Sequence, residues 1–112
     1  MKLSGANMIR HTVVFSLRHQ PGSPDELAFL DAALVLAGIP GVTKFERLRQ
    51  TSPKADYAFG FSMEFTDQKA YQVYNDHPDH VAFVRDRWVL EVDRFQEIDY
   101  VPLEPQPGIN GL

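Results

Sequence analysis

The chain has 112 residues, a formal net charge of −4 and no cysteine. This length fits a single domain, and the absence of cysteine excludes disulfides, thiolate catalysis and cysteine-ligated metals. Lysine and arginine are scattered, which argues against a nucleic-acid-binding face and a polybasic membrane anchor. Residues 1–8 lack the apolar stretch of a signal peptide, and no apolar run approaches the roughly 20 residues of a membrane span. We therefore expect a cytoplasmic protein with neither nucleic acid nor membrane as a partner.

The first predicted element is a strand over 9–18, where apolar and polar side chains alternate and His11 falls on the apolar side. A helix should follow, because Ser23 can cap its first turn and Pro24 occupies the favoured first position. Gly38 is the predicted end of this helix. Its buried face is predicted from four apolar residues at helical spacing: Leu27, Leu30, Leu34 and Ala37.

Two further strands are predicted next. Residues 42–49 follow a turn but alternate poorly, which indicates an edge strand with a possible bulge. Residues 57–65 alternate most clearly of all. Their bulky side chains share one face: Tyr57, Phe59, Phe61, Met63 and Phe65.

Thr66 or Asp67 can cap a short helix that runs to Tyr74, and a second helix should restart at Pro78. The second helix has an apolar stripe made of Val81, Val84, Trp88 and Val92. A last strand is predicted over about 95–101.

The order of these elements is β-α-β-β-α-β, with the second helix broken in two. This order predicts an α+β fold with a ferredoxin-like arrangement and an antiparallel sheet. The predicted domain spans residues 8–101. Residues 1–7 are interpreted as an N-terminal extension, and residues 102–112, rich in proline and glycine, as an irregular tail.

The second face of the two central strands predicts a homodimer. Small, mostly uncharged residues occupy it: Thr12, Val14, Ser16, Ala58, Gly60 and Ser62. A face of this kind is not typical of a solvated surface, and a second sheet packed on it would explain the pattern. The opposing interpretation is a half-exposed face whose small residues have no partner.

Four segments resemble one family. Residues 8–15 resemble the opening strand of the stress-responsive A/B barrel family, which carries a histidine there, and residues 39–42 resemble its turn into the second strand. The specific match is Tyr-x-x-His-Pro-x-His over 74–80, and residues 99–100 match the end of the last strand. The resemblance implies a homodimer whose two sheets face each other in a dimeric α/β barrel.

Function within this family is mostly unassigned, but one plant branch, the olivetolic acid cyclase type, closes a polyketide by aldol condensation without metal or cofactor. The resemblance carries its catalytic tyrosine and histidine onto Tyr74 and His80, with His11 also lining the pocket. The plant pattern has a further histidine in the third strand, where this chain has Phe59. The resemblance thus implies a small-molecule pocket that needs no cofactor.

Histidine can take and return a proton near neutral pH, and a tyrosine hydroxyl can hold a developing enolate oxygen. We therefore expect His80, Tyr74 and His11 to share a cavity between the sheet and the last helices. The expected binding residues around a small apolar or aromatic ligand are Phe59, Phe61, Phe83 and His77. The alternative is structural, with these histidines bonded to loop carbonyls or in the core.

Other functions stay open at this point. His77 and His80, with Asp76 and Asp79 beside them, could ligate a metal, but Pro78 separates the pair and no distant third ligand is evident, so no metal is expected. The favoured function is a cofactor-independent cyclase or lyase-like enzyme acting on a carbonyl or polyketide-like compound. The alternatives are a non-catalytic stress-associated dimer and a cofactor-free monooxygenase of the same superfamily.

Overall fold

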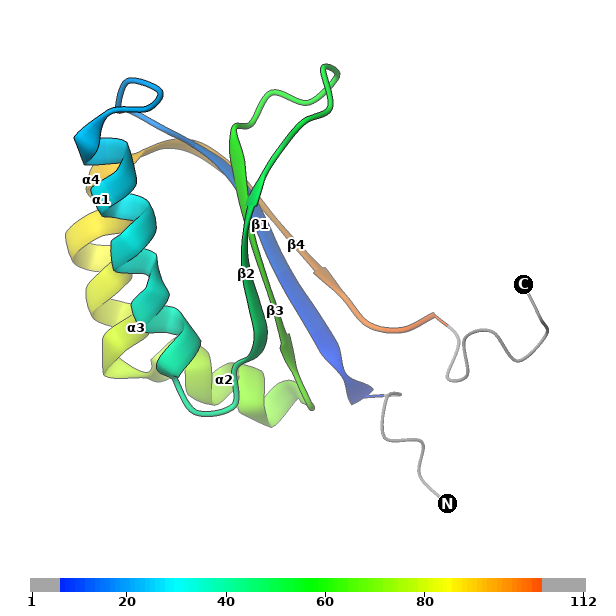
Figure 1. The fold of residues 1–112 in the computed structure, drawn as a ribbon. Helices are drawn as coiled ribbons and strands as arrows, with labels where there is room; N and C mark the ends of the chain where they lie inside the picture. The colour runs from blue at the N-terminus through cyan, green and yellow to red at the C-terminus, as the bar shows by residue number, and fades with distance from the viewer. Residues whose placement is uncertain (1–6, 104–112) are drawn as a thin grey trace.

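A four-stranded antiparallel sheet carries all the helices on one side (Figure 1). The computed structural model describes residues 7–103, so the predicted extension over 1–7 and tail over 102–112 lie almost entirely outside the described residues. In chain order the elements are β1 (Ile9–Leu17), α1 (Pro24–Ala32), η2 (Ala33–Gly38), β2 (Thr43–Arg49), β3 (Phe59–Phe65), α2 (Gln68–Asp76), α3 (Pro78–Phe83), η3 (Val84–Trp88), α4 (Val89–Glu91) and β4 (Val92–Tyr100). The predicted α+β, ferredoxin-like order is confirmed.

The strands lie in the order β2-β3-β1-β4, so β1 and β3 are central, as predicted. The pairing places His11 opposite Met63 of β3 and Asp99 of β4. At the edge, β2 contains a register shift, and Lys44 within it has a φ of 53°. The predicted edge strand and its bulge are therefore confirmed.

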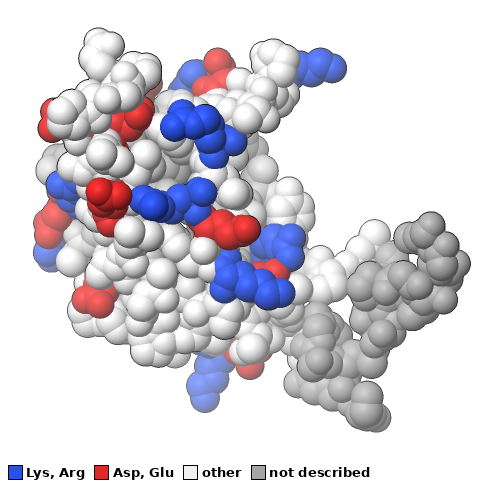
Figure 2. Space-filling model, in the orientation of Figure 1, with Lys and Arg blue, Asp and Glu red and all other residues white. Residues whose placement is uncertain are grey.

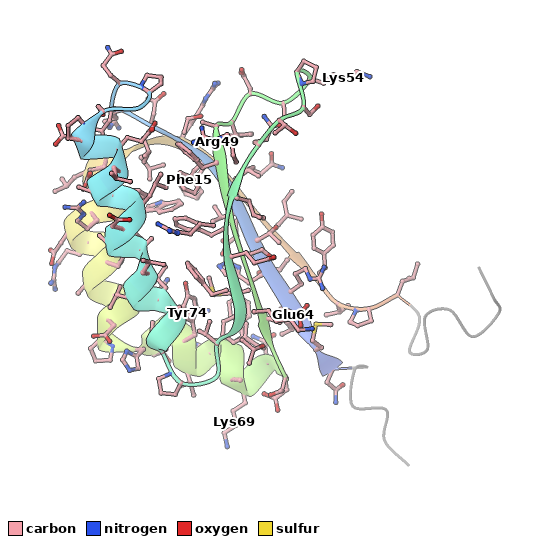
Figure 3. All side chains as sticks on the ribbon, viewed as in Figure 1. Phe15, Arg49, Lys54, Glu64, Lys69 and Tyr74 are labelled. Atoms are coloured by element: carbon pink, nitrogen blue, oxygen red, sulfur yellow. The ribbon has the colours of Figure 1, made fainter. Side chains whose placement is uncertain are left out.

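The core lies between the sheet and the helices, where Figure 3 places Phe15 and Tyr74. The bulky side chains of β1 and β3 meet there, and the Phe15 and Phe61 rings are 4.6 Å apart between centroids. Aromatic pairs at this spacing add stability beyond the area that they bury. This layer supplies the walls of the site described below.

The buried face of the first helix differs from the predicted one. Ser23 caps α1 as expected, its Oγ accepting from the Glu26 N–H at 3.2 Å. However, Leu27 and Leu34 are 60% and 47% exposed, whereas Phe29, Ala33 and Leu36 are buried. Both stripes have helical spacing, and the larger Phe29 ring buries more apolar area, so its stripe faces the sheet.

The last helical segment is also less regular than predicted. Between α3 and α4 lies η3, a π-helical turn. Of the predicted stripe, Val81 of α3 is exposed, and Phe83 is the buried residue of that helix. Val92, predicted on the helix, is the first residue of β4 and is buried. The last strand therefore begins at Val92 rather than near Phe95.

The open face of the sheet carries the small residues noted in the sequence. Gly60 of β3 lies opposite Val14 of β1, and Ser62 lies opposite Thr12.

On the surface shown in Figure 2, basic and acidic side chains are interleaved. Among residues 7–103, no helix is long and apolar enough to cross a membrane.

Candidate functional site

A pocket of about 790 Å³ lies between the sheet and the helices and opens over β4. It is lined by His11, Val13, Leu36, Phe61, Met63, Tyr74, Asn75, His80, Phe83, Val84, Trp88, Val89, Val92, Asp93, Arg94, Phe95 and Glu97. The structure thus brings His11, Tyr74 and His80 onto the wall of one pocket, with Phe61 and Phe83 beside them. The volume and the mostly apolar lining suit a small organic ligand.

Two expected binding residues do not line this pocket. Phe59 is buried near the end of the sheet, where the Arg49 guanidinium lies 5.2 Å from its ring centroid. His77 precedes α3, and its Nδ1 accepts a hydrogen bond from the Asp79 N–H at 3.1 Å. The alternation of β3 placed Phe59 on the correct face, but it could not show how far along the strand the pocket extends. His77 acts as a helix cap.

His80 presents one free nitrogen. Its Nδ1 lies 3.0 Å from the backbone oxygen of Asn75, and a carbonyl oxygen can only accept, so Nδ1 carries the proton. No group within residues 7–103 bonds its Nε2, which is therefore the basic atom of the neutral ring. Burial lowers the pKa of His80 below its ordinary value. His80 is therefore a neutral base at physiological pH.

His11 is held by the end of β4. Its Nδ1 lies 2.6 Å from Oδ1 of Asp99, and the Tyr71 hydroxyl donates to Oδ2 of the same carboxylate at 2.7 Å. Because the carboxylate only accepts, Nδ1 of His11 carries its proton and Nε2 is left as the basic atom. A buried histidine oriented by a carboxylate has a fixed tautomer and ring position.

Tyr74 completes the polar part of the pocket. Its ring centroid lies 4.4 Å from that of His80 and 6.0 Å from that of His11. Burial raises the pKa of Tyr74, and the Glu97 charge raises it further, so the phenol stays protonated. Since the described part of the chain gives its hydroxyl no hydrogen-bond partner, it can donate to a ligand oxygen.

Sequence reasoning missed Tyr71, Glu97 and the role of Asp99. The available signals were spacing and pairing. Tyr71 lies one helical turn before Tyr74, so both share a face of α2. Asp99 and Glu97 are two residues apart on β4, so both point to the helix side. A ferredoxin-like order pairs that strand with β1, which would have brought Asp99 beside His11.

Within residues 7–103, the only group of three or more side chains that could ligate a metal ion is formed by His11, Glu97 and Asp99. Their potential ligand atoms lie within 4.8 Å of one another. The proton of His11 Nδ1 already lies in the 2.6 Å bond to Asp99, so a metal ion would have to displace it. His77 and His80 do not converge, because their Nδ1 atoms bond Asp79 and Asn75, respectively. The expectation that no metal is needed stays a prediction.

Solved structures resemble this chain over most of its length. A Dabb family protein with a ferredoxin-like fold from Mesorhizobium loti is 69% identical, with a TM-score of 0.85, covering 87% of this chain and 98% of its own. The hydroxynitrile lyase of Passiflora edulis is 15% identical, with a TM-score of 0.77 and coverage of 91% and 99%. SnoaB, a cofactor-independent oxygenase from Streptomyces nogalater, is 18% identical, with a TM-score of 0.66 and the same coverage.

Three further matched structures, at 20 to 23% identity, are described as dimeric ferredoxin-like proteins of unknown function. At such identities the likeness shows the fold alone. No curated protein sequence matches the chain significantly. The family model of the stress responsive A/B barrel domain matches residues 9–102. Together with the Mesorhizobium loti relative, this match shows that the chain belongs to the stress-responsive A/B barrel domain family.

Proposed function

We propose that this protein is a homodimeric enzyme that removes a proton next to the carbonyl group of a small apolar or aromatic compound, in the manner of a cofactor-independent cyclase or lyase. The observation that carries the proposal is the pairing of two imidazoles in one pocket. Each has its Nδ1 bonded to an acceptor, so each keeps a basic Nε2. Two oriented bases beside a free phenol suit proton transfer.

In the proposed reaction, Nε2 of His80 takes the proton from the carbon next to the carbonyl. The electron pair of the broken C–H bond moves into the carbonyl, whose oxygen becomes an enolate oxygen. The Tyr74 hydroxyl donates a hydrogen bond to that oxygen and lowers the energy of the charged state. His11, whose ring Asp99 holds, would donate the proton that the product oxygen or carbon needs. The enolate carbon then attacks a second carbonyl or is reprotonated.

The pocket walls support an aromatic or acyl ligand. Trp88, Phe83 and Phe61 line the pocket together with the polar residues. The Phe15 ring packs against Trp88 at a tilt, with a centroid distance of 5.1 Å, and this close packing limits the movement of the wall. A rigid apolar wall positions the ligand so that its polar end meets His80 and Tyr74, which favours reaction over random collision.

The homodimer is supported by the open sheet face. Its edges expose apolar side chains, with Leu48 of β2 and Tyr100 of β4 46% and 54% exposed. Single exposed residues need no explanation, but these flank the small central residues Val14 and Gly60. Packing two such faces would bury both edges. The dimeric state of several fold relatives agrees with this arrangement.

Hydrogen–deuterium exchange of a simple benzyl ketone tests the proposed chemistry, because any compound with an acidic C–H next to a carbonyl can report proton removal. Phenylacetone in D2O, followed by proton NMR, should lose its benzylic hydrogens faster with the protein than in buffer. His80→Ala should slow the protein-dependent exchange by about 10²-fold or more, the usual contribution of a general base. His77→Asn is the matched control, because it changes a neighbouring histidine outside the pocket for another good helix cap.

The alternatives predict different results. A non-catalytic dimer would give the buffer rate with wild-type protein, which would refute the enzyme proposal. An oxygenase would consume dissolved oxygen and yield an oxidised ketone, whereas the proposed chemistry leaves the oxygen concentration unchanged. Equal rates for wild type and His80→Ala would exclude His80 as the base even if exchange is catalysed.

A further inference from the structure

We propose that Glu97 makes the pocket selective against anionic ligands, so that it takes neutral or cationic carbonyl compounds and rejects carboxylates and phosphates. This inference rests on the proposed function, because it names the ligand class of the same pocket. It is carried by the balance of charged side chains at the opening over β4. Three of them line the pocket there: Asp93, Arg94 and Glu97.

The one cation among these residues is already engaged. Arg94 donates from Nη1 to the Asp56 carboxylate at 2.8 Å and from Nη2 to the Asp56 backbone oxygen at 2.6 Å. Asp93 has Arg18 at 3.7 Å, a distant pair in which both side chains are more than half exposed. Both pairs are exposed, but Arg94 is held by two hydrogen bonds to one residue, whereas the Asp93–Arg18 pair is a single long contact of the kind that contributes little. The opening therefore has little free positive charge for an anionic ligand.

Glu97 is the uncompensated carboxylate. It lies opposite Val13 in the β1–β4 pairing and its side chain is half exposed on the pocket side. The nearest donor nitrogen is Nδ1 of His11 at 3.5 Å, but that N–H is 2.6 Å from Asp99, which accepts its hydrogen bond. The Tyr71 hydroxyl lies 3.4 Å from Oε2 of Glu97, but it is neutral and has its shorter contact, at 2.7 Å, to Asp99. Within residues 7–103, no lysine or arginine forms an ion pair with Glu97.

The charge of Glu97 is felt at the reacting end of the pocket. It contributes to the raised pKa of Tyr74, after burial, and it counteracts the lowering of the His80 pKa that burial causes. A ligand bound between these residues experiences the same negative field. Repulsion between like charges grows as water is excluded by apolar walls. An unpaired charge facing the ligand is a common way to reject the wrong partner. A hydroxyl or ammonium group on the ligand would instead be attracted to Glu97.

Three naphthalene compounds of nearly equal size test this selectivity: 2-acetylnaphthalene is neutral, 2-naphthoate is an anion and 2-naphthylmethylammonium is a cation. Trp88 is the single tryptophan of the chain and lines the pocket, so its indole N–H cross-peak in a ¹⁵N–¹H NMR titration reports binding at this site alone. We expect the anion to bind about tenfold more weakly, or worse, than the other two probes, equivalent to about 1.4 kcal/mol.

Glu97→Gln removes the charge at nearly constant size and should bring the affinity of 2-naphthoate close to that of 2-acetylnaphthalene. Asp25→Asn is the charge-matched control in the exposed first turn of α1, and it should preserve the discrimination. If Glu97→Gln does not fold, Glu97→Ala takes its place with the same expected result, and the three-probe comparison in the wild type tests the selectivity itself.

Equal binding of 2-naphthoate and 2-acetylnaphthalene to the wild type would overturn the selectivity proposal while leaving the pocket function intact. Unchanged discrimination in Glu97→Gln would also overturn it. If no probe shifts the Trp88 indole resonance, the pocket does not bind ligands of this class. That result would refute both the proposed function and the proposed selectivity.

Discussion

Asp99 and His11 face each other as direct partners in the antiparallel pairing of β4 with β1, and the Asp99 carboxylate accepts from Nδ1 of His11 at 2.6 Å. The sheet backbone therefore fixes the separation of these side chains. Tyr71, from α2, donates to the second oxygen of the same carboxylate at 2.7 Å. This chain of bonds connects the helical layer to an edge strand and orients a pocket histidine.

The two tyrosines of α2 should separate stability from activity. Tyr71→Phe removes the donor to Asp99 and should lower the free energy of unfolding by about 1–3 kcal/mol, as expected for a hydrogen bond to a charged group. Tyr74→Phe removes a hydroxyl with no partner in the described residues, so its stability change should be within about 0.5 kcal/mol, while ketone exchange should fall markedly. Urea unfolding and the exchange rate measure the two effects. A large loss of stability in Tyr74→Phe together with a large loss of exchange in Tyr71→Phe would contradict these roles.

The exchange rate should depend on pH through His80. Burial lowers its pKa in the folded protein, so its basic form should persist below about pH 6.5, the ordinary value for histidine. The rate should fall only as the pH drops through that lowered pKa. The stabilising contribution of the neutral ring is likewise fully present above about pH 6.5 and is lost as the pH falls through the folded pKa.

A pH–rate profile and an NMR titration of the His80 ring should give the same midpoint. Nα-acetylhistidinamide in the same buffers provides the reference. A midpoint at or above the reference value would contradict the assignment of a buried neutral base.

The dimer prediction concentrates on Gly60, at the centre of the open sheet face. Gly60→Glu should give the monomer mass by light scattering, because the interface would have to bury an unpaired charge. Gly60→Ala is the matched control and should remain dimeric. A Cβ there would lie 3.4 Å from the Val13 oxygen and 3.8 Å from Val14 Cγ1, which are ordinary contacts. A wild-type monomer at micromolar concentration would refute the proposed homodimer.

Folding should not require a metal ion. The nitrogen and oxygen atoms of the His11–Asp99 pair already bond each other, and His77 Nδ1 is used in capping α3. Thermal melting after EDTA treatment should give the same midpoint as the untreated protein. A large decrease that zinc or manganese reverses would show that a metal stabilises the fold.

The element order was predictable because it depends on local signals that the structure retains. The alternation of β1, the Ser23 cap and the Pro78 restart are all properties of a few neighbouring residues. The choice between Leu27 and Phe29 was not local, since both stripes fit a helix and only contact with Phe15 and Phe83 distinguishes them. The π-helical turn at η3 likewise depends on how the segment packs over the sheet.

The candidate site could be predicted only in part from the sequence. His11, Tyr74 and His80 belong to segments with recognisable patterns, and their elements converge at one pocket. Asp99 and Glu97 lie on a strand whose side chains on the pocket side are largely exposed, so no apolar alternation marked their orientation. Their partners became evident only from the register of β4 with β1.

The most direct measurement of the central claim is a long-range ¹H–¹⁵N NMR spectrum of the histidine rings, assigned with His11→Gln and His80→Gln variants. At neutral pH the His80 ring should be neutral, with its proton on Nδ1 and an unprotonated Nε2, and the His11 proton shared with Asp99 should lie on Nδ1. Adding 2-acetylnaphthalene should shift both Nε2 resonances. A proton on Nε2 of His80 in the free protein, or Nε2 resonances of both histidines that do not shift when the ketone is added, would contradict a pocket in which two oriented imidazoles contact one ligand.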